Sequence, residues 1–249
     1  MITYDGFDLS DYLLVIDIGR PLMPPQELTT KAILGRNGVY FIEKKHGPVV
    51  IPVEVMIYED LGMTYSEMKR FLAEKLNKKS PKRLIFHDEP DRYIDAIIQD
   101  ETEIRNLIQA GQGTLNFFCP DPYYYAIEDE VFTYNGPGGF NFTRAKGNEE
   151  SEPLIEIEGT NSGGAITIKT DNTKIVFNGR LSTGEILVLD SHFITAYVIQ
   201  TNGSQRSANN DIDNMTFPIL QVGANHVEIQ CQGNATVNTV RIYARSRWI

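Results

Sequence analysis

The sequence predicts a mainly β protein with one helix, divided into two halves close to Tyr125. In the first half, short apolar runs surround a single pattern of helical periodicity over residues 64–77. In the second half, from Pro153 onward, apolar runs alternate with Asn-rich and Gly-rich turns, which is typical of an antiparallel sandwich. Between the halves, Pro120-Asp121-Pro122 ends an apolar run, because two prolines fix their φ angles and withhold two amide donors.

The composition is that of a globular protein large enough for two domains. The chain has 249 residues, of which 41% are hydrophobic and 22% charged. Its net charge of -10 argues against sequence-independent binding of nucleic acid. No apolar run approaches the roughly 20 residues that span a bilayer, and the first residues lack the pattern of a secretion signal. We therefore expect that the protein does not associate with a membrane and that it is made in a cytoplasm.

Turn signals define the strands of the first half. Asp5-Gly6 predicts a short opening hairpin, and the run Leu13–Ile18 predicts a strand that precedes a proline-rich extended crossing at residues 21–25. Asn37-Gly38, within the stretch Leu34–Phe41, predicts a type I′ hairpin between apolar strands. A further strand over Val49–Tyr58 contains Pro52, which indicates an edge strand or a bulge.

The helix is predicted from a capping box and from apolar spacing. Thr64 and Glu67 stand at the capping-box spacing, and Met68, Phe71 and Leu72 begin the buried stripe. Basic residues gather on the outward side and tail of the helix: Lys69, Arg70, Lys75, Lys78, Lys79, Lys82 and Arg83. They are either a solvated face that suits a helix C-terminus or a contact for an acidic neighbouring subunit.

The rest of the first half is predicted to be paired strands. Residues 83–87 and 92–98 flank the turn Asp88-Glu89-Pro90-Asp91, and residues 111–119 form the last strand. The polar turn and His87 contain residue types that could bind a metal ion or act as a general acid and base. Adjacent carboxylates on a proline turn point in different directions, so caps and interface salt bridges are the better interpretation.

The second half is predicted to begin with an arm. Residues 131–152 have the Gly-rich and acidic composition of a linker, with Phe132, Tyr134, Phe140 and Phe142 available for docking. We expect domains at 1–130 and 153–249, joined by this segment, with the last strand able to return to the first domain. Strands are predicted at 154–157, 165–168, 175–177, 186–189, 193–199, 227–231 and 237–243.

The sequence contains no signature of an active site. Nucleophile-elbow, zinc-protease and Walker motifs are absent, and Cys119 and Cys231 lack metal-ligand spacing, which favours buried reduced thiols. Asp211 and Asp213 could offer oxygen ligands to calcium, although a solvated loop fits the incomplete spacing better. We therefore predict no catalytic residue, no cofactor and no metal.

Several motifs together resemble one family. Residues 34–38 near the start, Phe86–Tyr93, and Phe118–Tyr123 are similar to segments of the distal tail proteins of long-tailed phages and prophages of Gram-positive bacteria. The late segments 217–220 and 223–225, with Arg247-Trp248-Ile249, resemble the second domain of that family. The similarity covers nearly the whole chain through the order and spacing of these motifs.

The resemblance implies an architectural protein. It implies an N-terminal ring-forming domain that assembles as a homo-hexamer, and a C-terminal galectin-like sandwich. The ring would lie between the tail tube protein and the tail-associated hub or lysin protein, near receptor-binding proteins, and DNA would pass its lumen without specific binding. The expected location is the virion tail tip, assembled in the host cytoplasm.

Candidate interface residues follow from this reading and from local composition. The tyrosines after the Pro-Asp-Pro break offer wide apolar faces with polar tips, and Trp248 stands on a terminal strand, where packing or docking is a better interpretation than a sugar platform. The alternative function is a glycan-binding module that uses the sandwich. The candidate interface residues are Arg36, Asn37, Tyr40, Phe41, Lys69, Arg70, Asp88, Glu89, Asp91, Arg92, Tyr123, Tyr124, Tyr125 and Trp248.

Overall fold

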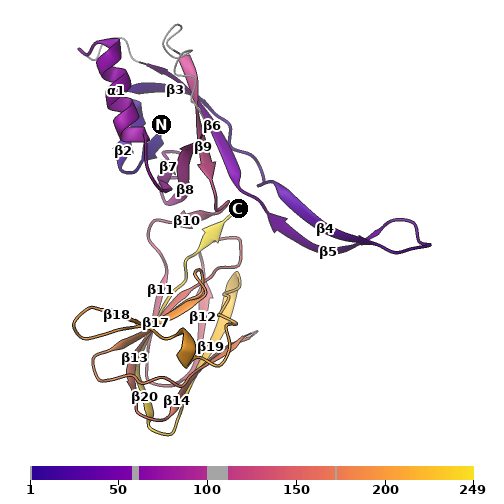
Figure 1. Cartoon of the computed structure of the whole chain (residues 1–249), viewed down its shortest axis with the longest axis vertical. Coiled ribbons are helices and arrows are strands. Elements are labelled where there is room, and N and C mark those ends of the chain that lie inside the picture. The colour runs from indigo at the N-terminus through magenta and orange to yellow at the C-terminus, as the bar shows by residue number, and fades with distance from the viewer. Residues whose placement is uncertain (1, 58–61, 100–111, 172) are drawn as a thin grey trace. The chain divides into compact units, whose positions relative to one another are not determined.

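The computed structural model describes residues 2–57, 62–99, 112–171 and 173–249 (Figure 1). It divides into two compact units, Met1–Tyr124 with Ile249, and Tyr125–Trp248. Both are built from antiparallel sheets, and α1 (Tyr65–Leu76) is the one α-helix in the described ranges. The mainly β fold with one helix is therefore confirmed. The galectin likeness of the second unit stays a prediction.

The first unit contains a seven-stranded path in the order β2-β1-β7-β8-β9-β6-β3. Neighbouring strands pair antiparallel, and the first two form the opening hairpin expected at Asp5-Gly6, where both residues have positive φ. A 3-10 turn, η1 (Leu9–Asp11), leads into β3. The strand bounds are β1 Ile2–Tyr4, β2 Phe7–Asp8, β3 Leu13–Ile18, β6 Val49–Ile57, β7 Lys82–Phe86, β8 Arg92–Gln99 and β9 Gln112–Cys119.

Helix α1 covers the inner side of this sheet. Thr64 caps it with the predicted capping box, in which the Thr64 hydroxyl accepts from the Glu67 amide. Met68, Leu72 and Leu76 are buried in one core with the strand residues Ile51 and Val53. The alternate residues of β6 point to the opposite side and are exposed, so the sheet has one face covered by the helix and one outward face.

A long hairpin projects from the first unit (Figure 1). Its strands are β4 (Gln26–Ala32) and β5 (Val39–His46), which pair antiparallel with a bulge at Thr29/Thr30. The predicted type I′ turn at Asn37-Gly38 is wrong. The connection covers residues 33–38, and its left-handed residues are Gly35 and Gly38, whereas Asn37 keeps a negative φ. The predicted hairpin is confirmed, but its loop is longer than two residues.

Pro52 lies in a central strand, which corrects the expectation of an edge. β6 pairs with β9 on one side and with β3 on the other. The Pro52 carbonyl accepts the Gly19 amide at 2.8 Å, so the missing N–H of Pro52 also faces the β3 side. The ladder with β3 ends at Ile18, which pairs with Val53. The proline is tolerated because its partner strand stops there.

The second unit is a sandwich of two antiparallel sheets. One has the order β11-β20-β13-β16-β17-β18 and the other β12-β19-β14-β15. Apolar residues from both sheets, such as Ile157, Ile168 and Val240, form one buried core. The bounds are β11 Val131–Asn135, β12 Gly138–Arg144, β13 Leu154–Asn161, β14 Ala165–Thr170, β15 Lys174–Phe177, β16 Ile186–Asp190, β17 Thr195–Ile199, β18 Gln205–Ser207, β19 Gly223–Gln232 and β20 Ala235–Tyr243.

The predicted arm at 131–152 is wrong over its first half. Residues 131–135 and 138–144 are edge strands of the two sheets, paired with β20 and β19. Their aromatic residues dock on one another across the sandwich, with ring centroids 4.4 Å apart for Phe132 and Phe142 and 4.3 Å apart for Tyr134 and Phe140. Glycine-rich composition suggested a linker, yet the alternating aromatics mark strands that close one side of the core.

The remaining elements are two short strands and a 3-10 turn. β10 (Tyr124–Ala126) pairs with β21 (Arg247–Trp248), and the Ala126 amide donates to the Ser246 carbonyl at 3.1 Å. A 3-10 turn, η2 (Asn209–Asp211), follows β18. The expected return of the last strand to the first domain stays a prediction.

Candidate assembly surfaces

The β4–β5 hairpin exposes both of its faces. Because side chains alternate along β4 and cross-strand partners share a face, one face carries Leu28, Thr30 and Ala32 with their partners Lys44, Phe41 and Val39. Leu28, Val39 and Phe41 are 59%, 61% and 63% exposed. We call the six residues the apolar hairpin face. An uncovered apolar face of this kind marks an interaction site.

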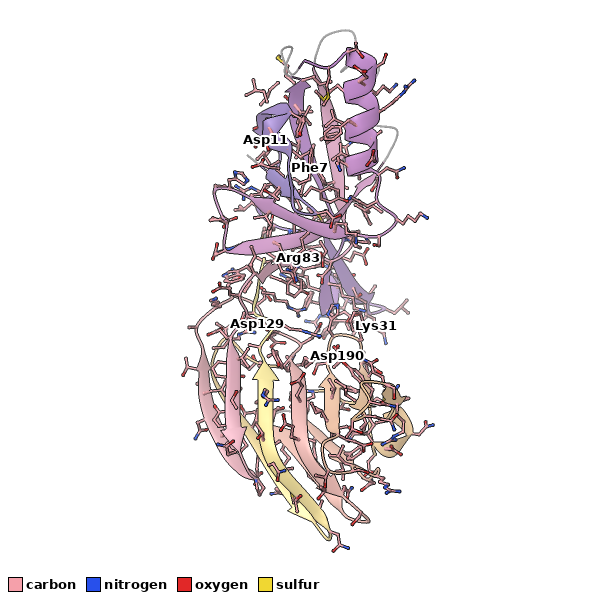
Figure 2. The ribbon with its side chains drawn as sticks, turned by 90° about the vertical axis from the view of Figure 1, so that its left-hand side faces the viewer. Phe7, Asp11, Lys31, Arg83, Asp129 and Asp190 are labelled. Atoms are coloured by element: carbon pink, nitrogen blue, oxygen red, sulfur yellow. The ribbon has the colours of Figure 1, made fainter. Side chains whose placement is uncertain are left out.

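The opposite face of the hairpin is polar and internally paired. Glu27, Thr29 and Lys31 of β4 lie opposite Lys45, Glu43 and Tyr40 of β5. Lys45 forms an ion pair with Glu43 at 3.2 Å, and the Thr29 hydroxyl donates to the same carboxylate. These charges cancel within the face. Figure 2 labels Lys31 on this hairpin.

The four predicted interface residues of the hairpin are distributed over its tip. Arg36 and Asn37 lie in the loop, and Tyr40 and Phe41 lie on different faces of β5. The Arg36 guanidinium lies 4.8 Å from the Tyr40 ring centroid and donates to the Tyr40 hydroxyl. The sequence reading missed Leu28 and Val39, whose signal was the alternation of β4 and its pairing with β5.

The root of the hairpin is held by hydrogen bonds and by a charged cluster. The Gly47 amide donates to the Pro25 carbonyl at 2.7 Å, which closes the hairpin base. Arg20, in the crossing before β4, donates to Asp88 and to Glu89, the latter at 2.9 Å, and its guanidinium lies 4.8 Å from the Phe86 ring centroid. Partial burial opposes the charge on Arg20, but the bond to Asp88 outweighs it and raises the pKa of the guanidinium.

The predicted turn residues therefore anchor the hairpin root within their own unit. Arg92 forms ion pairs with Glu89 at 3.2 Å and with Asp91 at 3.4 Å. His87 shares a hydrogen bond with Thr3 at 3.0 Å. In the parts of the chain that the structure describes, no group of three His, Cys, Asp or Glu side chains could hold a metal ion.

Charge is segregated within the first unit. Residues 64–83 contain seven basic and two acidic side chains, although the whole chain carries a net charge of -10. Lys69 and Arg70 are exposed on α1, whereas Lys78 is paired with Asp5 at 2.7 Å. Lys75 lies 5.5 Å from the Phe71 ring centroid. The helix surface is thus basic next to a largely acidic remainder, which suits contact between unlike patches.

The three tyrosines after the Pro-Asp-Pro break do not form one group. Tyr123 stacks on His46 with ring centroids 6.1 Å apart, and Tyr124 packs 6.4 Å from Phe86. Burial raises the pKa of the Tyr124 hydroxyl to about 12. Tyr125 begins the second unit and is half-buried. Their role as interface residues stays a prediction, as does that of the half-buried Trp248.

The remaining polar candidates are occupied by protein donors. Asp211 accepts from Arg206 at 2.9 Å, and Asp213 accepts from the Asn178 side-chain amide at 2.6 Å. Both cysteines are free thiols; Cys119 is buried, and burial raises its pKa to about 12, while Cys231 is half-buried. The two carboxylates therefore accept hydrogen bonds from other side chains of the same unit.

The outward face of the first unit's sheet is a surface that sequence reasoning missed. Leu14, Ile16 and Val50 are between 43% and 46% exposed on β3 and β6. Asp17 and Glu54 lie directly opposite each other on the same two strands, and both are exposed. This surface combines apolar side chains with two carboxylates. We call these five residues the outward sheet face.

Family models match both units of the chain. Residues 7–119 match the phage tail protein RIFT-related domain, and residues 146–248 match the siphovirus-type tail component, C-terminal domain. A curated relative, the distal tail protein of Bacillus phage SPP1, is 26% identical over 205 residues, which cover 77% of each protein.

Solved structures share the fold. The crystal structure of the Dit protein of phage SPP1, described as a paradigm of hub adsorption apparatus in phages that infect Gram-positive bacteria, matches with a TM-score of 0.72. That match covers 100% of this chain and 98% of the other at 16% identity. A chain of the phage p2 baseplate, in its activated conformation with Sr, matches with a TM-score of 0.50 at 12% identity, over 94% of this chain and 91% of the other. Two consecutive family domains, a curated relative and a full-length fold match agree, and the chain belongs to the distal tail protein family of siphophages.

Proposed function

We propose that this distal tail protein forms a homo-hexameric ring, the structural hub of a siphophage tail tip. The ring lies between the tail tube protein and the tail-associated hub or lysin protein, close to receptor-binding proteins. DNA passes its lumen without specific binding, which agrees with the net charge of -10. Assembly takes place in the host cytoplasm. Family membership supports the hub role. The hexameric ring is the further part of the proposal.

One observation carries the self-assembly: an anchored hairpin presents an uncovered apolar face. An isolated two-stranded hairpin is at best marginally stable in water, yet this one extends from a fixed root with Leu28, Val39 and Phe41 mostly exposed. Such a surface is costly unless a partner covers it. Segregated charge in the first unit adds unlike patches, which head-to-tail contacts in a closed ring require.

The relatives favour this architectural role over glycan binding and over catalysis. The curated relative is a distal tail protein, and the two family domains are tail components. We propose no enzymatic activity for the chain. No helix in the described residues is long and apolar enough to cross a membrane.

Light scattering with negative-stain imaging of the purified protein tests the ring. Six copies of a 28.1 kDa chain give a particle of about 170 kDa with sixfold views. A chain that remains a monomer at every concentration would overturn the ring.

Two hairpin variants sharpen that test. Phe41→Ser removes an aromatic side chain from the apolar hairpin face, and Tyr40→Ser removes its neighbour from the polar face. We expect Phe41→Ser to disperse the ring and Tyr40→Ser to have the smaller effect, because burial of apolar area drives such contacts. Equal effects of the two variants would contradict the assignment of the faces.

A further inference from the structure

We infer that Asn37, at the tip of the β4–β5 hairpin, is a site of spontaneous deamidation by water. The sequence contains four Asn-Gly pairs, at residues 37–38, 135–136, 178–179 and 202–203. Asparagine loses its side-chain amide most readily before glycine, which places no side chain beside the attacking backbone nitrogen. The local structure distinguishes the four pairs and leaves the first one open. The reaction needs no partner and is independent of the proposed ring.

The reaction takes place within the chain. The backbone nitrogen of Gly38 attacks Cγ of Asn37, a C–N bond forms, and the side-chain nitrogen leaves as ammonia with the proton of the Gly38 amide. Water then adds to one of the two carbonyl carbons of the resulting succinimide and breaks a C–N bond, which yields aspartate or isoaspartate. The sum is one amide and one water converted into one carboxylate and one ammonium ion. A hydrogen bond to either reacting group must break first.

Three of the four pairs are held by such hydrogen bonds. The Asn178 side-chain amide donates to the Asp213 carboxylate at 2.6 Å. The backbone amides of Gly136 and Gly203 donate to backbone carbonyls at 2.9 Å and 2.8 Å. At each of these pairs one reacting group is therefore occupied in the folded protein.

The pair at the hairpin tip has neither restraint. Among the hydrogen bonds of the described residues, none involves the Asn37 side chain or the Gly38 amide. Gly38 also stands outside the β4–β5 ladder, which begins with the pair Ala32 and Val39. Every residue of the connection 33–38 is exposed, and this connection lies at the far end of the hairpin (Figure 1). Both reacting groups are thus free to turn toward each other in contact with water.

Deamidation changes the charge and the backbone of the tip. Arg36 is the one charged residue of the connection 33–38, and its guanidinium donates to the Tyr40 hydroxyl. A carboxylate at position 37 balances that charge. Isoaspartate also inserts a methylene group into the main chain, directly before the left-handed Gly38, whose φ is 87°. The tip is therefore a surface whose charge depends on the age of the protein.

Timed incubation of the full-length protein in water at mildly alkaline pH tests the site. The protein is cleaved after lysine at intervals, and mass spectrometry measures the acid fraction at each Asn-Gly pair. Cleavage releases residues 32–44, in which Asn37 is the only asparagine. We expect its amide to be lost about tenfold faster than the other three, because no hydrogen bond has to break first. Equal rates at the four pairs, or no acid at Asn37, would overturn the inference.

The same incubation in guanidinium chloride is the matched control. Unfolding removes the hydrogen bonds that protect three of the pairs, so we expect all four to react at similar rates. A lead of Asn37 that persists in the denatured chain would assign its reactivity to the sequence, and the structural inference would be wrong.

Two variants connect the reaction to the charge of the tip. Asn37→Asp carries the charge of the product from the start, so aged wild type should approach its position on an anion-exchange column. Asn37→Gln keeps an amide but would have to close a larger ring, so its position should not change with age. Aged wild type that does not approach Asn37→Asp would contradict the change in charge. An equal shift in Asn37→Gln would place the reaction at another residue.

Discussion

Asp190 and Arg245 form a two-point ion pair, with distances of 2.6 Å from Nη1 to Oδ1 and 2.9 Å from Nη2 to Oδ2. The pair joins the last residue of β16 to the segment after β20. Asp190 also accepts the backbone amides of His192 and Phe193, and Asp129 accepts the Arg245 amide at 2.7 Å. Figure 2 labels Asp129 and Asp190 at the same end of the second unit. One buried carboxylate thus fixes two separate segments.

Replacement of Asp190 should destabilise the second unit. Asp190→Asn keeps the size of the side chain but leaves the Arg245 guanidinium without its counter-charge. Removal of one partner from a buried pair costs about 3–5 kcal/mol, and we expect a loss near the lower end in guanidinium denaturation. Asp171→Asn, at an exposed position, is the matched control and should change stability by less than about 0.5 kcal/mol. A loss below about 1 kcal/mol for Asp190→Asn would contradict the structural role of the pair.

The same pair predicts a pH dependence. Burial alone would raise the pKa of Asp190, but the hydrogen bonds and charge of Arg245 outweigh it and hold the pKa below its ordinary value. A lowered pKa means that the stabilisation is complete above the unfolded-state pKa, about 3.9, and disappears as the pH falls through the lower folded-state pKa. The stability difference between wild type and Asp190→Asn should therefore be constant from about pH 5 to 7 and shrink below about pH 4. Denaturation midpoints between pH 2.5 and 7 measure it, and a difference that grows on acidification has the wrong sign.

Ile194 holds a strained backbone conformation at the end of the Asp190 turn. Its φ of 50° lies in the left-handed region, which a β-branched residue rarely adopts, and its side chain is exposed. Ile194→Gly should stabilise the protein by about 1 kcal/mol, because glycine adopts this conformation without the steric cost. Thermal unfolding measures the gain. Ile194→Val retains the β-branch and should show none, so equal gains from both variants would point to a cause other than the backbone.

The aromatic closure of the sandwich predicts a graded loss of stability. Phe142 is buried, whereas Phe140 is half-buried on the same strand. Phe142→Ala should cost about 3–5 kcal/mol through lost burial and the cavity left behind. Phe140→Ala should cost clearly less, because part of its ring already contacts water. Denaturant unfolding of both variants tests the order, and the reverse order would mean that Phe142 is not part of the core.

Gly159 permits a close approach of two strands. A Cβ atom there would lie 2.1 Å from the Thr236 carbonyl oxygen, at the bulge where the pairing of β13 with β20 shifts. Gly159→Ala should therefore cost at least about 2 kcal/mol, since backbone must move to accept the methyl group. At Gly203 a Cβ meets nothing within 4 Å, so Gly203→Ala carries only the cost of its positive φ. Comparable losses for the two variants would show that the bulge adapts easily.

The sequence predicts the elements that depend on local chemistry. The capping box at Thr64 gave the start of α1, and Asp5-Gly6 gave the opening hairpin, because both signals act within four residues. Features set by distant partners were missed. The place of Pro52 in a central strand depends on where β3 ends, and the strands at 131–144 depend on partners in β19 and β20 that lie far later in the chain.

The candidate surfaces divide in the same way. The hairpin that exposes Phe41 can be predicted from the sequence. The outward sheet face cannot, because it depends on the strand register that places Asp17 opposite Glu54. Asp88 and Glu89 form ion pairs with Arg20 within one unit, and their place at an interface between subunits stays a prediction. Composition alone cannot distinguish a contact inside a chain from one between chains.

The pairing of β11 with β20 and of β12 with β19 has a consequence for folding kinetics. Phe132 of β11 lies opposite Ile242 of β20. The first strands of the second unit can therefore pair only after its last strands have been synthesised. Such distant pairings raise the contact order and slow the search for the native state. Until then β11 and β12 present open edges and uncovered aromatics, a state prone to aggregation. We therefore expect slow, all-or-none refolding of this unit, and truncation inside β20 should abolish it.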